Sequence, residues 1–299
     1  MHGVLVVDKP EGPTSHDVVA VARRALRTRQ VGHAGTLDPM ATGVLVVMVG
    51  AATRLARFFS DEPKAYDATL RLGLETDSGD RTGAVVARAP EGAPWPGREA
   101  VEEALERLRA AAEQVPPALS AKWVAGERAY TLARAGADVP VRAAPVTLHE
   151  ARILEYEPPR LHLALHCSSG FYVRALARDL GRLLGTGGCL EALRRTASAD
   201  FTVAEAVSLD LLVREPEAAA ARLVGLDRLL PRLPEARLTP SGERKARHGN
   251  DLGAGDLAGP VPACPAGGVV RLVAGNGRLM GLGRPAAAPA VLHPAVVLQ

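Results

Sequence analysis

The sequence predicts an α+β protein in which a large mixed domain is followed by a small β-rich module. Segments with apolar residues at every second position, typical of half-buried strands, occur together with segments whose apolar residues recur at helical spacing. The chain has 299 residues, which is long for one core and sufficient for a large domain plus a small one. Pro231, Pro234 and Pro240 mark a change of composition after Leu230. These three observations predict the fold class.

The composition is that of an ordinary soluble protein. Apolar residues make up 47% of the chain and charged residues 23%, and the formal net charge of +3 permits a polyanionic partner without proving one. Cys167, Cys189 and Cys264 lie far apart and form no CxxC pair, so neither a disulfide framework nor a zinc site is indicated. The apolar start is too short for a signal peptide, and no apolar run reaches membrane-spanning length. We therefore expect a cytoplasmic protein.

The first elements are a short strand and an amphipathic helix. Val4 to Val7 form an apolar run, which turn residues end between Asp8 and Pro13. Thr14 or Ser15 can cap the following helix. Its apolar face consists of Val18, Ala22, Ala25 and Leu26. Its outer face carries a group of arginines, which is either a solvated surface or a set of phosphate contacts: Arg23, Arg24, Arg27 and Arg29.

The most unusual stretch runs from Gly32 to Leu45 and reads GHAGTLDPMATGVL. It contains three glycines, one proline, one histidine and one acid, Asp38. The proline restricts the backbone of the preceding acid to extended conformations, whereas the glycines permit backbone shapes that other residues resist. We therefore expect Asp38 to be held in one pose, although an isolated Asp-Pro pair is usually ordinary turn chemistry.

Two strands and a helical segment are expected around this loop and after it. Val44 to Val49 is a continuous apolar run, and a short helix is predicted through Leu55 to Phe59. From Tyr66 to Leu72 apolar residues alternate with polar ones, which predicts a strand with one buried face. Tyr66 lies on that face, where a tyrosine taken alone is usually a packing residue.

A proline- and glycine-rich loop is expected from Ala89 to Pro96, followed by a long helix. This helix is predicted to continue to Val115 and to stop at Pro116. Its apolar face would consist of Val101, Leu105, Leu108, Ala112 and Val115. In the next segment Trp123 is either a packing residue or a platform for a nucleic-acid base, and packing is favoured.

The next strand is predicted from Leu161 to Cys167 because its apolar residues alternate with polar ones. His162 and His166 share its polar face, but no third ligand is near in sequence, so we expect solvated histidines and no metal site. After the stretch CSSGFYVR, which ends at Arg174, a helix is predicted. Its apolar positions are Leu176, Leu180 and Leu183, and Gly185 ends it.

The C-terminal residues read as a separate module, so the chain is divided into residues 1–235 and residues 236–299. The second part is too short for a large core but long enough for a small β-rich unit. Val269 to Val273 and Leu279 to Gly283 are its strand-like segments. Before them stands a basic group: Arg237, Arg244, Lys245, Arg247 and His248.

Several of these stretches together resemble the tRNA pseudouridine(55) synthases, the TruB family. The stretch around Asp38 resembles the signature of that family at most positions, and agreement over such a length is rarely accidental. Residues 120–136 and 190–196 are similar to the family's RNA-binding cleft and pocket wall, and the C-terminal module resembles, more weakly, a PUA RNA-binding domain. The other matching motifs are Lys9-Pro10-x-Gly12, Lys64-x-Tyr66 with residues 72–80, and Cys167 to Arg174.

The resemblance implies a fold and a function. It implies the pseudouridine synthase fold, with a mixed, largely antiparallel central sheet flanked by helices. The implied reaction converts one uridine in the T loop of tRNA, U55, to pseudouridine after the base has been flipped into a pocket. Because this isomerisation changes no oxidation state and adds no outside atom, no cofactor and no metal are expected. The expected partner is the T arm of tRNA, and the protein is expected to be a monomer that requires no protein partner.

In this family the acid corresponding to Asp38 is the catalytic nucleophile, and the arginine corresponding to Arg174 pairs with it. A carboxylate in a dry pocket tends to become protonated, and a guanidinium beside it opposes that tendency while fixing its orientation. Three routes remain open: attack on C1′, attack on C6 of the base, or assistance in removing the C2′ proton.

The same resemblance implies a set of substrate-binding residues that includes Arg174. Tyr66 is expected to stack under the base and Leu193 to cover it. His33 would fill the space that the base leaves in the RNA. Lys9 is expected to support the floor of the site, and Tyr172 belongs to the same set.

Two other classes of function remain as alternatives. A glycosidase-like enzyme would also bring a carboxylate to the bond between sugar and base, but it usually needs a second carboxyl group, and the loop around Asp38 contains none. A non-catalytic tRNA-binding or RNA-folding protein would fit the basic clusters and the PUA-like module.

Overall fold

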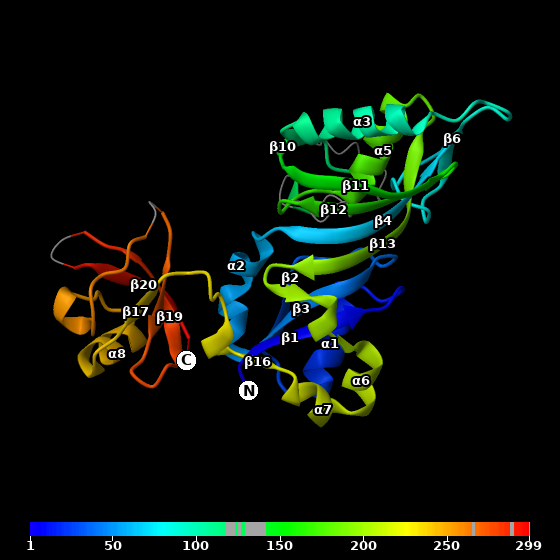
Figure 1. Cartoon of the computed structure of the whole chain (residues 1–299). Helices are drawn as coiled ribbons and strands as arrows, with labels where there is room; N and C mark the ends of the chain where they lie inside the picture. Colours follow the sequence, from blue (N-terminus) through cyan, green and yellow to red (C-terminus); the bar gives the residue numbers. More distant parts are fainter. Residues whose placement is uncertain (118–122, 125–126, 129–141, 265–266, 288–289, 299) are drawn as a thin grey trace.

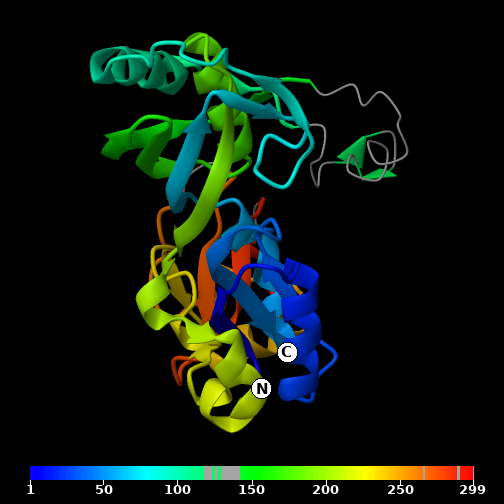
Figure 2. The ribbon, with the colours of Figure 1, turned by 90° about the vertical axis from the view of Figure 1, so that its right-hand side faces the viewer.

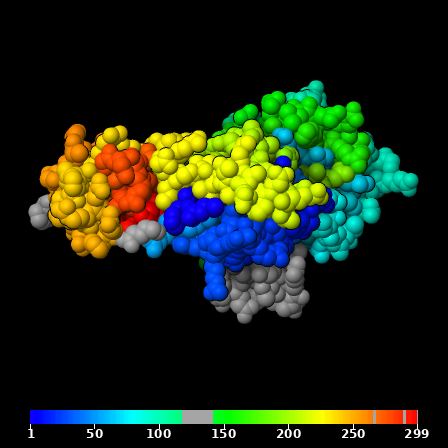
Figure 3. Space-filling view, turned by 90° about the horizontal axis from the view of Figure 1, so that it is seen from below, coloured from blue at the N-terminus to red at the C-terminus, as the bar shows by residue number. Residues whose placement is uncertain are grey.

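The computed structural model describes residues 1–117, 123–124, 127–128, 142–264, 267–287 and 290–298. A long central sheet carries helices near both of its ends, and a smaller sheet of C-terminal residues lies beside it (Figure 1). The C-terminal residues form one end of an elongated molecule (Figure 3). No helix in the described part of the chain is long and apolar enough to cross a membrane.

The central sheet has ten strands, and its main path runs β11-β12-β4-β13-β3-β1-β15. Neighbouring strands are antiparallel except for β13 with β3 and β1 with β15, which confirms the predicted mixed, largely antiparallel sheet. The strands of the path are β1 Gly3–Lys9, β3 Thr42–Val49, β4 Lys64–Leu72, β11 Leu148–Glu157, β12 Arg160–Cys167, β13 Gly188–Ser198 and β15 Val207–Ser208, with β2 Val31–Ala34, β14 Phe201–Thr202 and β16 Val224–Gly225 paired beside it.

Helices pack on both halves of this sheet. Helices α3 and α5 pack on the β11, β12, β4 and β13 side, whereas α1, α6 and α7 lie by β1 (Figure 1). Strands β4 and β13, cyan and yellow-green, connect the two halves (Figure 2). The helices are α1 Ser15–Ala25, α2 Ala56–Ser60, α3 Arg98–Ala110, α5 Val173–Leu183, α6 Leu209–Arg214 and α7 Pro216–Ala221, with 3₁₀ turns at η1 Gly50–Leu55, η2 Val203–Glu205 and η3 Leu226–Arg228.

Strand β3 is apolar from Val44 to Val49 because both of its faces are covered. Leu45 and Val47 pack with the helices on one face. Val46 and Met48 pack on the other, against η1, Phe59 and residues of the C-terminal sheet. A strand buried on both faces reads as a continuous apolar run, which is the pattern of this segment.

Strands β4 and β12 are buried on one face only. Leu70 and Leu163 belong to the core under α3 and α5. Thr69 and His162, which stand opposite each other across the two strands, are partly exposed on the other face. This difference in exposure explains the alternating pattern from which both strands were predicted.

Helix α1 begins where the sequence predicts. The Thr14 side chain accepts a hydrogen bond from the backbone N–H of Asp17 at 3.1 Å. In return, the Asp17 carboxylate accepts one from the backbone N–H of Thr14 at 2.8 Å. This reciprocal capping box satisfies two of the backbone donors at the start of the helix, so it fixes the position of that start.

The prediction for α3 was wrong at its C-terminal end. The helix ends at Ala110, the next residue has an extended backbone, and Gln114 lies in a short strand. The Gln114 amide donates to the carbonyl of Tyr172 at 3.0 Å and accepts from its N–H at 2.8 Å. These tertiary hydrogen bonds require an extended backbone at Gln114. Val115 is exposed, so the helical spacing of apolar residues that includes Val115 does not mark a buried helix face.

Several short strand pairs and two long strands were not predicted. Strand β11 is mostly exposed, and β13 contains two bulges that break the period of two. Residues 120–136 lie largely outside the described part of the chain, as does the side chain of Trp123. The short pairs are β5 Leu74–Thr76 with β6 Val85–Arg88, β7 Glu113–Gln114 with β10 Ala144–Pro145, and β8 Trp123–Val124 with β9 Glu127–Arg128.

The C-terminal residues form a four-stranded sheet in the order β17-β18-β19-β20. It has an apolar core of its own, to which Leu272 and Met280 contribute. Val273 and Leu279 instead join the core shared with β3 and η1, so the smaller sheet packs against the larger part. The elements are β17 Glu235–Arg237, α8 Pro240–Arg247, η4 Ala254–Asp256, β18 Val270–Val273, β19 Leu279–Pro285 and β20 Leu292–Val297.

Gly43 is the position in the central sheet where a side chain should be most damaging. Its φ of +99° lies in a region that other residues rarely adopt, and a Cβ would lie 2.2 Å from the carbonyl oxygen of Arg195. We expect Gly43→Ala to destabilise the protein by about 3 kcal/mol or more, because both the strained backbone and the contact between β3 and β13 must shift. Chemical denaturation measures this free energy of unfolding.

Gly12→Ala is the matched control for Gly43→Ala. Gly12 also has a positive φ, +109°, but nothing lies within 4 Å of a Cβ built there. We expect it to cost only the backbone strain, about 1–2 kcal/mol. Equal losses in the two variants would contradict the steric explanation.

Candidate active site

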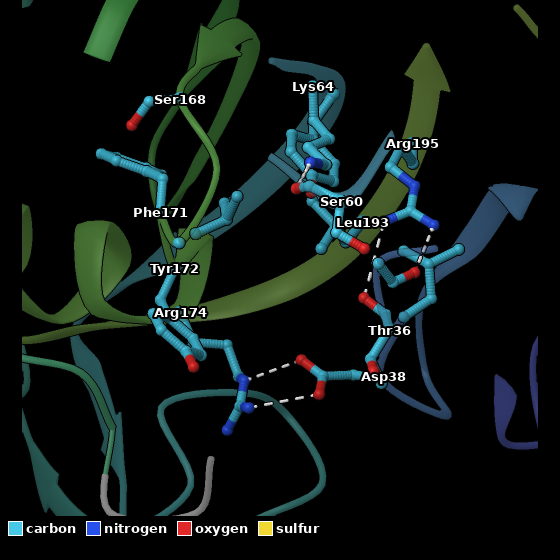
Figure 4. Close-up of a pocket in the computed structure, with 15 residues that line it drawn as sticks. Thr36, Asp38, Ser60, Lys64, Ser168, Phe171, Tyr172, Arg174, Leu193 and Arg195 are labelled. Carbon is cyan, nitrogen blue, oxygen red and sulfur yellow. Dashed lines mark hydrogen bonds and ion pairs between the residues drawn. The ribbon is translucent and has the colours of Figure 1, made fainter. Parts of the chain in front are cut away.

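A cavity of about 370 Å³ opens where the loop before β3, the strands β4 and β13, and the segment before α5 meet (Figure 4). This volume is in the range of small-molecule sites. Six of the residues that line it carry the chemistry discussed below: Asp38, Tyr66, Tyr172, Arg174, Leu193 and Arg195. The sequence named all of them except Arg195 as functional residues.

The loop that presents Asp38 is held by hydrogen bonds to the first residue of α1. The buried Ser15 hydroxyl accepts a hydrogen bond from the N–H of Leu37 at 2.9 Å and lies 3.2 Å from the Leu37 carbonyl. On the far side of the acid, the Pro39 carbonyl accepts from the N–H of Gly12 at 2.9 Å. Both neighbours of Asp38 are therefore held by the preceding turn and helix, which confines the acid to one place.

Lys9 acts on the same loop from inside the protein. Its side chain is fully buried, and its ammonium donates to the carbonyls of Pro10, Pro13 and Pro39. Burial lowers the pKa of Lys9 to about 8. The sequence placed Lys9 in the substrate-binding set and also at the floor of the site. Its burial rules out contact with a ligand in this conformation and leaves the supporting role.

Arg174 holds Asp38 with both arms of its guanidinium. Arg174 Nε lies 2.9 Å from Asp38 Oδ2, and Nη2 donates to Oδ1 at 3.2 Å (Figure 4). The Arg174 side chain is 7% exposed, whereas that of Asp38 is 35% exposed and faces the cavity. The fork fixes the direction of the carboxylate and leaves it accessible to a ligand.

A second acid, Asp80, stands behind Arg174. Asp80 Oδ2 lies 3.8 Å from Arg174 Nε, and Arg174 Nη1 donates to the carbonyl of Ser78 at 2.9 Å. Asp80 is buried, and its Oδ1 accepts hydrogen bonds from Ser78 and Thr82. The guanidinium is thus positioned between two carboxylates. Asp80 lies within residues 72–80, which belong to one of the matching motifs, but no role was predicted for it.

Tyr66 and Leu193 line the cavity from the central sheet. They lie on the neighbouring strands β4 and β13, where Leu193 pairs with Ala68 and Tyr66 pairs with Arg195. Burial raises the pKa of Tyr66, so its phenol is neutral near pH 7. A neutral aromatic ring and an aliphatic side chain at one cavity suit the two faces of a planar base.

Tyr172 and Phe171 lie on the α5 side of the cavity. Tyr172 is the residue that caps the N-terminus of α5, and the Gln114 amide holds its backbone. Phe171 was not assigned a role from the sequence, although it belongs to the matching stretch from Cys167 to Arg174. The turn before α5 and the first turn of this helix therefore bring two aromatic residues and Arg174 to the same cavity.

His33 is the one expected substrate-binding residue that lies neither at the cavity wall nor beneath it. It stands on β2, and its ring meets that of His16 edge to face at a centroid distance of 5.3 Å. Its Nδ1 is buried, with no hydrogen-bond partner among the described residues. In this conformation His33 packs beside the loop that carries Asp38.

Among the described residues, no group of three or more His, Cys, Asp and Glu side chains could hold a metal ion. His162 and His166 lie on β12, as the sequence predicted. The ring of His166 lies beside that of His149, with a centroid distance of 5.0 Å.

Family models match most of the chain. Residues 23–173 match the N-terminal domain of the TruB family pseudouridylate synthases, and residues 174–231 match the tRNA pseudouridylate synthase B C-terminal domain. The chain belongs to the TruB family of pseudouridylate synthases. It is therefore an isomerase, as the resemblance of its motifs implied.

Curated relatives cover nearly the whole chain of this TruB family member. The tRNA pseudouridine synthase B of Aromatoleum aromaticum is 44% identical over 282 residues, which cover 94% of this chain and 88% of the relative. That of Solibacter usitatus is 41% identical, and the alignment covers 100% of both chains.

Solved structures share the fold of this TruB family member. One is described as an H/ACA RNP bound to a substrate RNA containing 2′-deoxyuridine, with a TM-score of 0.73. Another is described as a Cbf5-Nop10-Gar1 complex, with a TM-score of 0.75. Both are 22% identical to this chain, and each match covers 99% of this chain and 85% of the other. These matches confirm the predicted fold class.

The position of His33 in this TruB family member predicts a dependence of stability on pH. Burial, and to a smaller extent the charges of His16 and Arg195, lower the pKa of His33 from 6.5 to about 4. The unfolded chain therefore binds a proton below pH 6.5 that the folded protein does not bind until about pH 4. The free energy of unfolding should fall by about 3 kcal/mol through this residue as the pH falls from 7 to 4.

His33→Phe isolates this effect because it keeps a buried ring and removes the titrating group. We expect the unfolding free energy of the variant, measured by urea denaturation at intervals between pH 7 and 4, to fall less steeply than that of the wild type. Parallel curves for the two proteins would show that His33 does not carry this pH dependence.

Proposed function

We propose that this protein converts the uridine at position 55, in the T loop of tRNA, to pseudouridine. The observation that carries the proposal is the Asp38 carboxylate, clamped by Arg174 and exposed to a cavity that also presents Tyr66 and Leu193. Two curated relatives that cover this chain almost entirely are named tRNA pseudouridine synthase B, which supports tRNA as the substrate.

The reaction rearranges bonds within one nucleotide. The N1 to C1′ bond breaks, the uracil turns, and C5 bonds to C1′; C5 then loses its hydrogen as a proton, and N1 gains a proton. The base must leave the RNA stack to reach the cavity, which costs a few kcal/mol. We assign to Tyr66 the lower face of the base and to Leu193 the upper face, so that binding in the cavity offsets part of this cost.

Asp38 is the proposed catalytic residue. Its free edge faces the cavity, so a ribose bound there would bring C1′ towards the carboxylate. Attack on C1′, attack on C6 of the base and assistance in removing the C2′ proton all require an ionised acid at this point. Arg174 favours the ionised form and keeps the oxygens in place.

His33 and the C-terminal module are given supporting roles. His33 lies beside the loop of Asp38, from which a side-chain movement could bring it into the gap that the base leaves in the RNA. We divide the chain into a catalytic domain of residues 1–235 and a PUA-like RNA-binding domain of residues 236–299. In the basic group of that domain, Lys245 is paired with Asp256 and Arg237 with Glu235. A cytoplasmic location and a monomeric state stay predictions.

Tritium release tests the proposal directly. Transfer RNA that carries tritium at C5 of uridine should lose one tritium per molecule to water, and nucleoside analysis should show pseudouridine at position 55. An isolated T-arm hairpin should also react. Free uracil among the products would instead indicate glycosidase chemistry. Binding of tRNA without tritium release would indicate the second candidate, a non-catalytic RNA-binding protein, which the basic group on α8 and β17 favours.

A further inference from the structure

Arg195 is the most deeply buried charged residue that lines the cavity, and the proposed mechanism gives it no role. It lies on β13 and is 1% exposed. Among the described residues, its guanidinium donates to backbone carbonyls of the loop around Asp38 and lies within hydrogen-bonding reach of the Tyr66 side chain. Figure 4 shows it beside Thr36, with Asp38 between it and Arg174.

The guanidinium reaches both ends of this loop. Arg195 Nε donates to the carbonyl of Val44 at 2.7 Å, after Asp38 in the chain. Nη2 donates to the carbonyl of Gly35 at 3.0 Å, and Nη1 lies 3.5 Å from that of Thr36, both before Asp38. One planar, rigid group therefore sets the separation of the two ends of the loop.

The backbone of Arg195 is tied to the same loop. Arg195 pairs with Gly43 in the short parallel contact between β13 and β3. The close approach of Gly43 to the Arg195 carbonyl, described above, depends on the missing side chain of the glycine. Main-chain and side-chain contacts of one residue thus converge on the segment that presents Asp38.

Arg195 also meets the residue proposed to lie under the base. It stands directly opposite Tyr66 across β13 and β4, so both side chains point to the same face of the sheet. The positive charge of Arg195 lowers the pKa of Tyr66 against the larger, opposite effect of burial. The same side chain therefore lies between the Tyr66 ring and the Asp38 loop.

The charge of Arg195 has no acidic partner within the described part of the chain. No carboxylate there lies within 4.0 Å of its guanidinium, and backbone carbonyls are its acceptors. An unpaired buried cation is costly, and Lys64 nearby has its pKa lowered to about 8, by burial first and by Arg195 second. A neutral apolar side chain would be buried here at lower cost, so we take the fork geometry of the guanidinium as the feature that this site requires.

We propose that Arg195 is a positioning residue of the reaction, whose guanidinium fixes the distance between the Asp38 carboxylate and a base that lies on Tyr66. The proposal rests on the proposed function. Arg195 does not touch the reacting atoms; it acts through the carbonyls of Gly35, Thr36 and Val44. Lysine cannot replace it, because a single ammonium on a flexible stem cannot reach acceptors at both ends of the loop in one geometry.

Arg195→Lys tests the proposal because it keeps the charge and removes the fork. The single-turnover rate of tritium release should fall about 100-fold, the effect of a misplacement of about 1 Å at a reacting centre. The dissociation constant for tRNA should stay within about threefold of the wild type, since the contacts of the protein with the RNA backbone and with the flipped base persist. Filter binding and thermal melting of the same samples give the affinity and the folded fraction.

Arg160→Lys is the matched control. Arg160 is an exposed arginine on β12 whose partner is Glu191, and its substitution should leave rate, affinity and melting unchanged. If Arg195→Lys does not fold, Gly35→Ala tests the same contact from the loop side. Gly35 has a φ of +82°, so alanine strains the backbone whose carbonyl Arg195 Nη2 binds, and we expect the same loss of rate with retained binding.

The outcomes separate the two proposals. A wild-type protein that releases no tritium from tRNA would end the proposed function. A wild type that is active, together with an Arg195→Lys variant whose rate is within threefold of it, would overturn only the role of Arg195. So would a loss of activity that arises entirely from weaker tRNA binding.

Discussion

Asp38→Asn is expected to lower the single-turnover rate of tritium release by about 10⁴-fold or more. The substitution keeps the size of the side chain and removes the negative charge that every proposed route requires. In addition, one terminal atom of asparagine is an amide nitrogen, which cannot accept a hydrogen bond from Arg174, so half of the bidentate contact is lost. The rate is measured with C5-tritiated tRNA in excess enzyme.

The affinity of Asp38→Asn for tRNA should not fall with the rate. Asp38 places a negative charge near a polyanionic substrate, so its removal should leave the affinity for tRNA unchanged or slightly raised. Asp210→Asn, at an exposed position of α6 far from the cavity, serves as the control and should keep full activity. Tritium release by Asp38→Asn at the wild-type rate would refute the assignment of the catalytic residue.

The regular elements could be predicted from the sequence because burial there follows a simple period. β3 is covered on both faces, and β4 and β12 on one, so their apolar patterns match the strands closely. Likewise, α1 carries its own start signal in the Thr14 and Asp17 capping box. In these segments local pattern and tertiary burial agree, which is the condition under which such predictions succeed.

Where local pattern and tertiary contacts disagree, the predictions failed. Nothing in the apolar spacing up to Val115 indicates that the Gln114 amide will bind the backbone before α5. Strand β13 buries Arg195 and contains two bulges, so its sequence does not alternate. Both features depend on segments distant in sequence, which a local pattern does not contain.

Some residues of the candidate site could likewise be predicted from the sequence, and others could not. Asp38 stands out because the glycines and the proline around it mark a constrained loop. Arg174 was expected as its partner only from the family resemblance, and the structure places the two side chains in contact. The contacts of Asp80 and Arg195 could not be predicted, because they form only in the folded chain. Asp80 lies near the guanidinium of Arg174, and Arg195 binds carbonyls of the loop around Asp38. The identity of a residue in a motif did not reveal these positions.

Arg174→Met is the second substitution with a very large expected effect. It removes the cation that lies between Asp38 and Asp80 and leaves two carboxylates near each other without compensation. The rate of tritium release should fall about 10³-fold, and the unfolding free energy should fall by about 2–4 kcal/mol, because one partner of a mostly buried pair is lost. Arg174→Lys keeps the charge without the fork and should lose about 10²-fold in rate.

The double variant Asp38→Asn with Arg174→Met decides whether the two residues act as a unit. If Arg174 acts only by holding and ionising Asp38, its removal costs nothing further once the carboxylate is gone. The double variant should then react as slowly as Asp38→Asn alone, not 10³-fold more slowly. Losses that multiply would instead mean that Arg174 acts on the substrate independently of Asp38. Because both single losses are large, single-turnover rates of the four proteins distinguish these two results clearly.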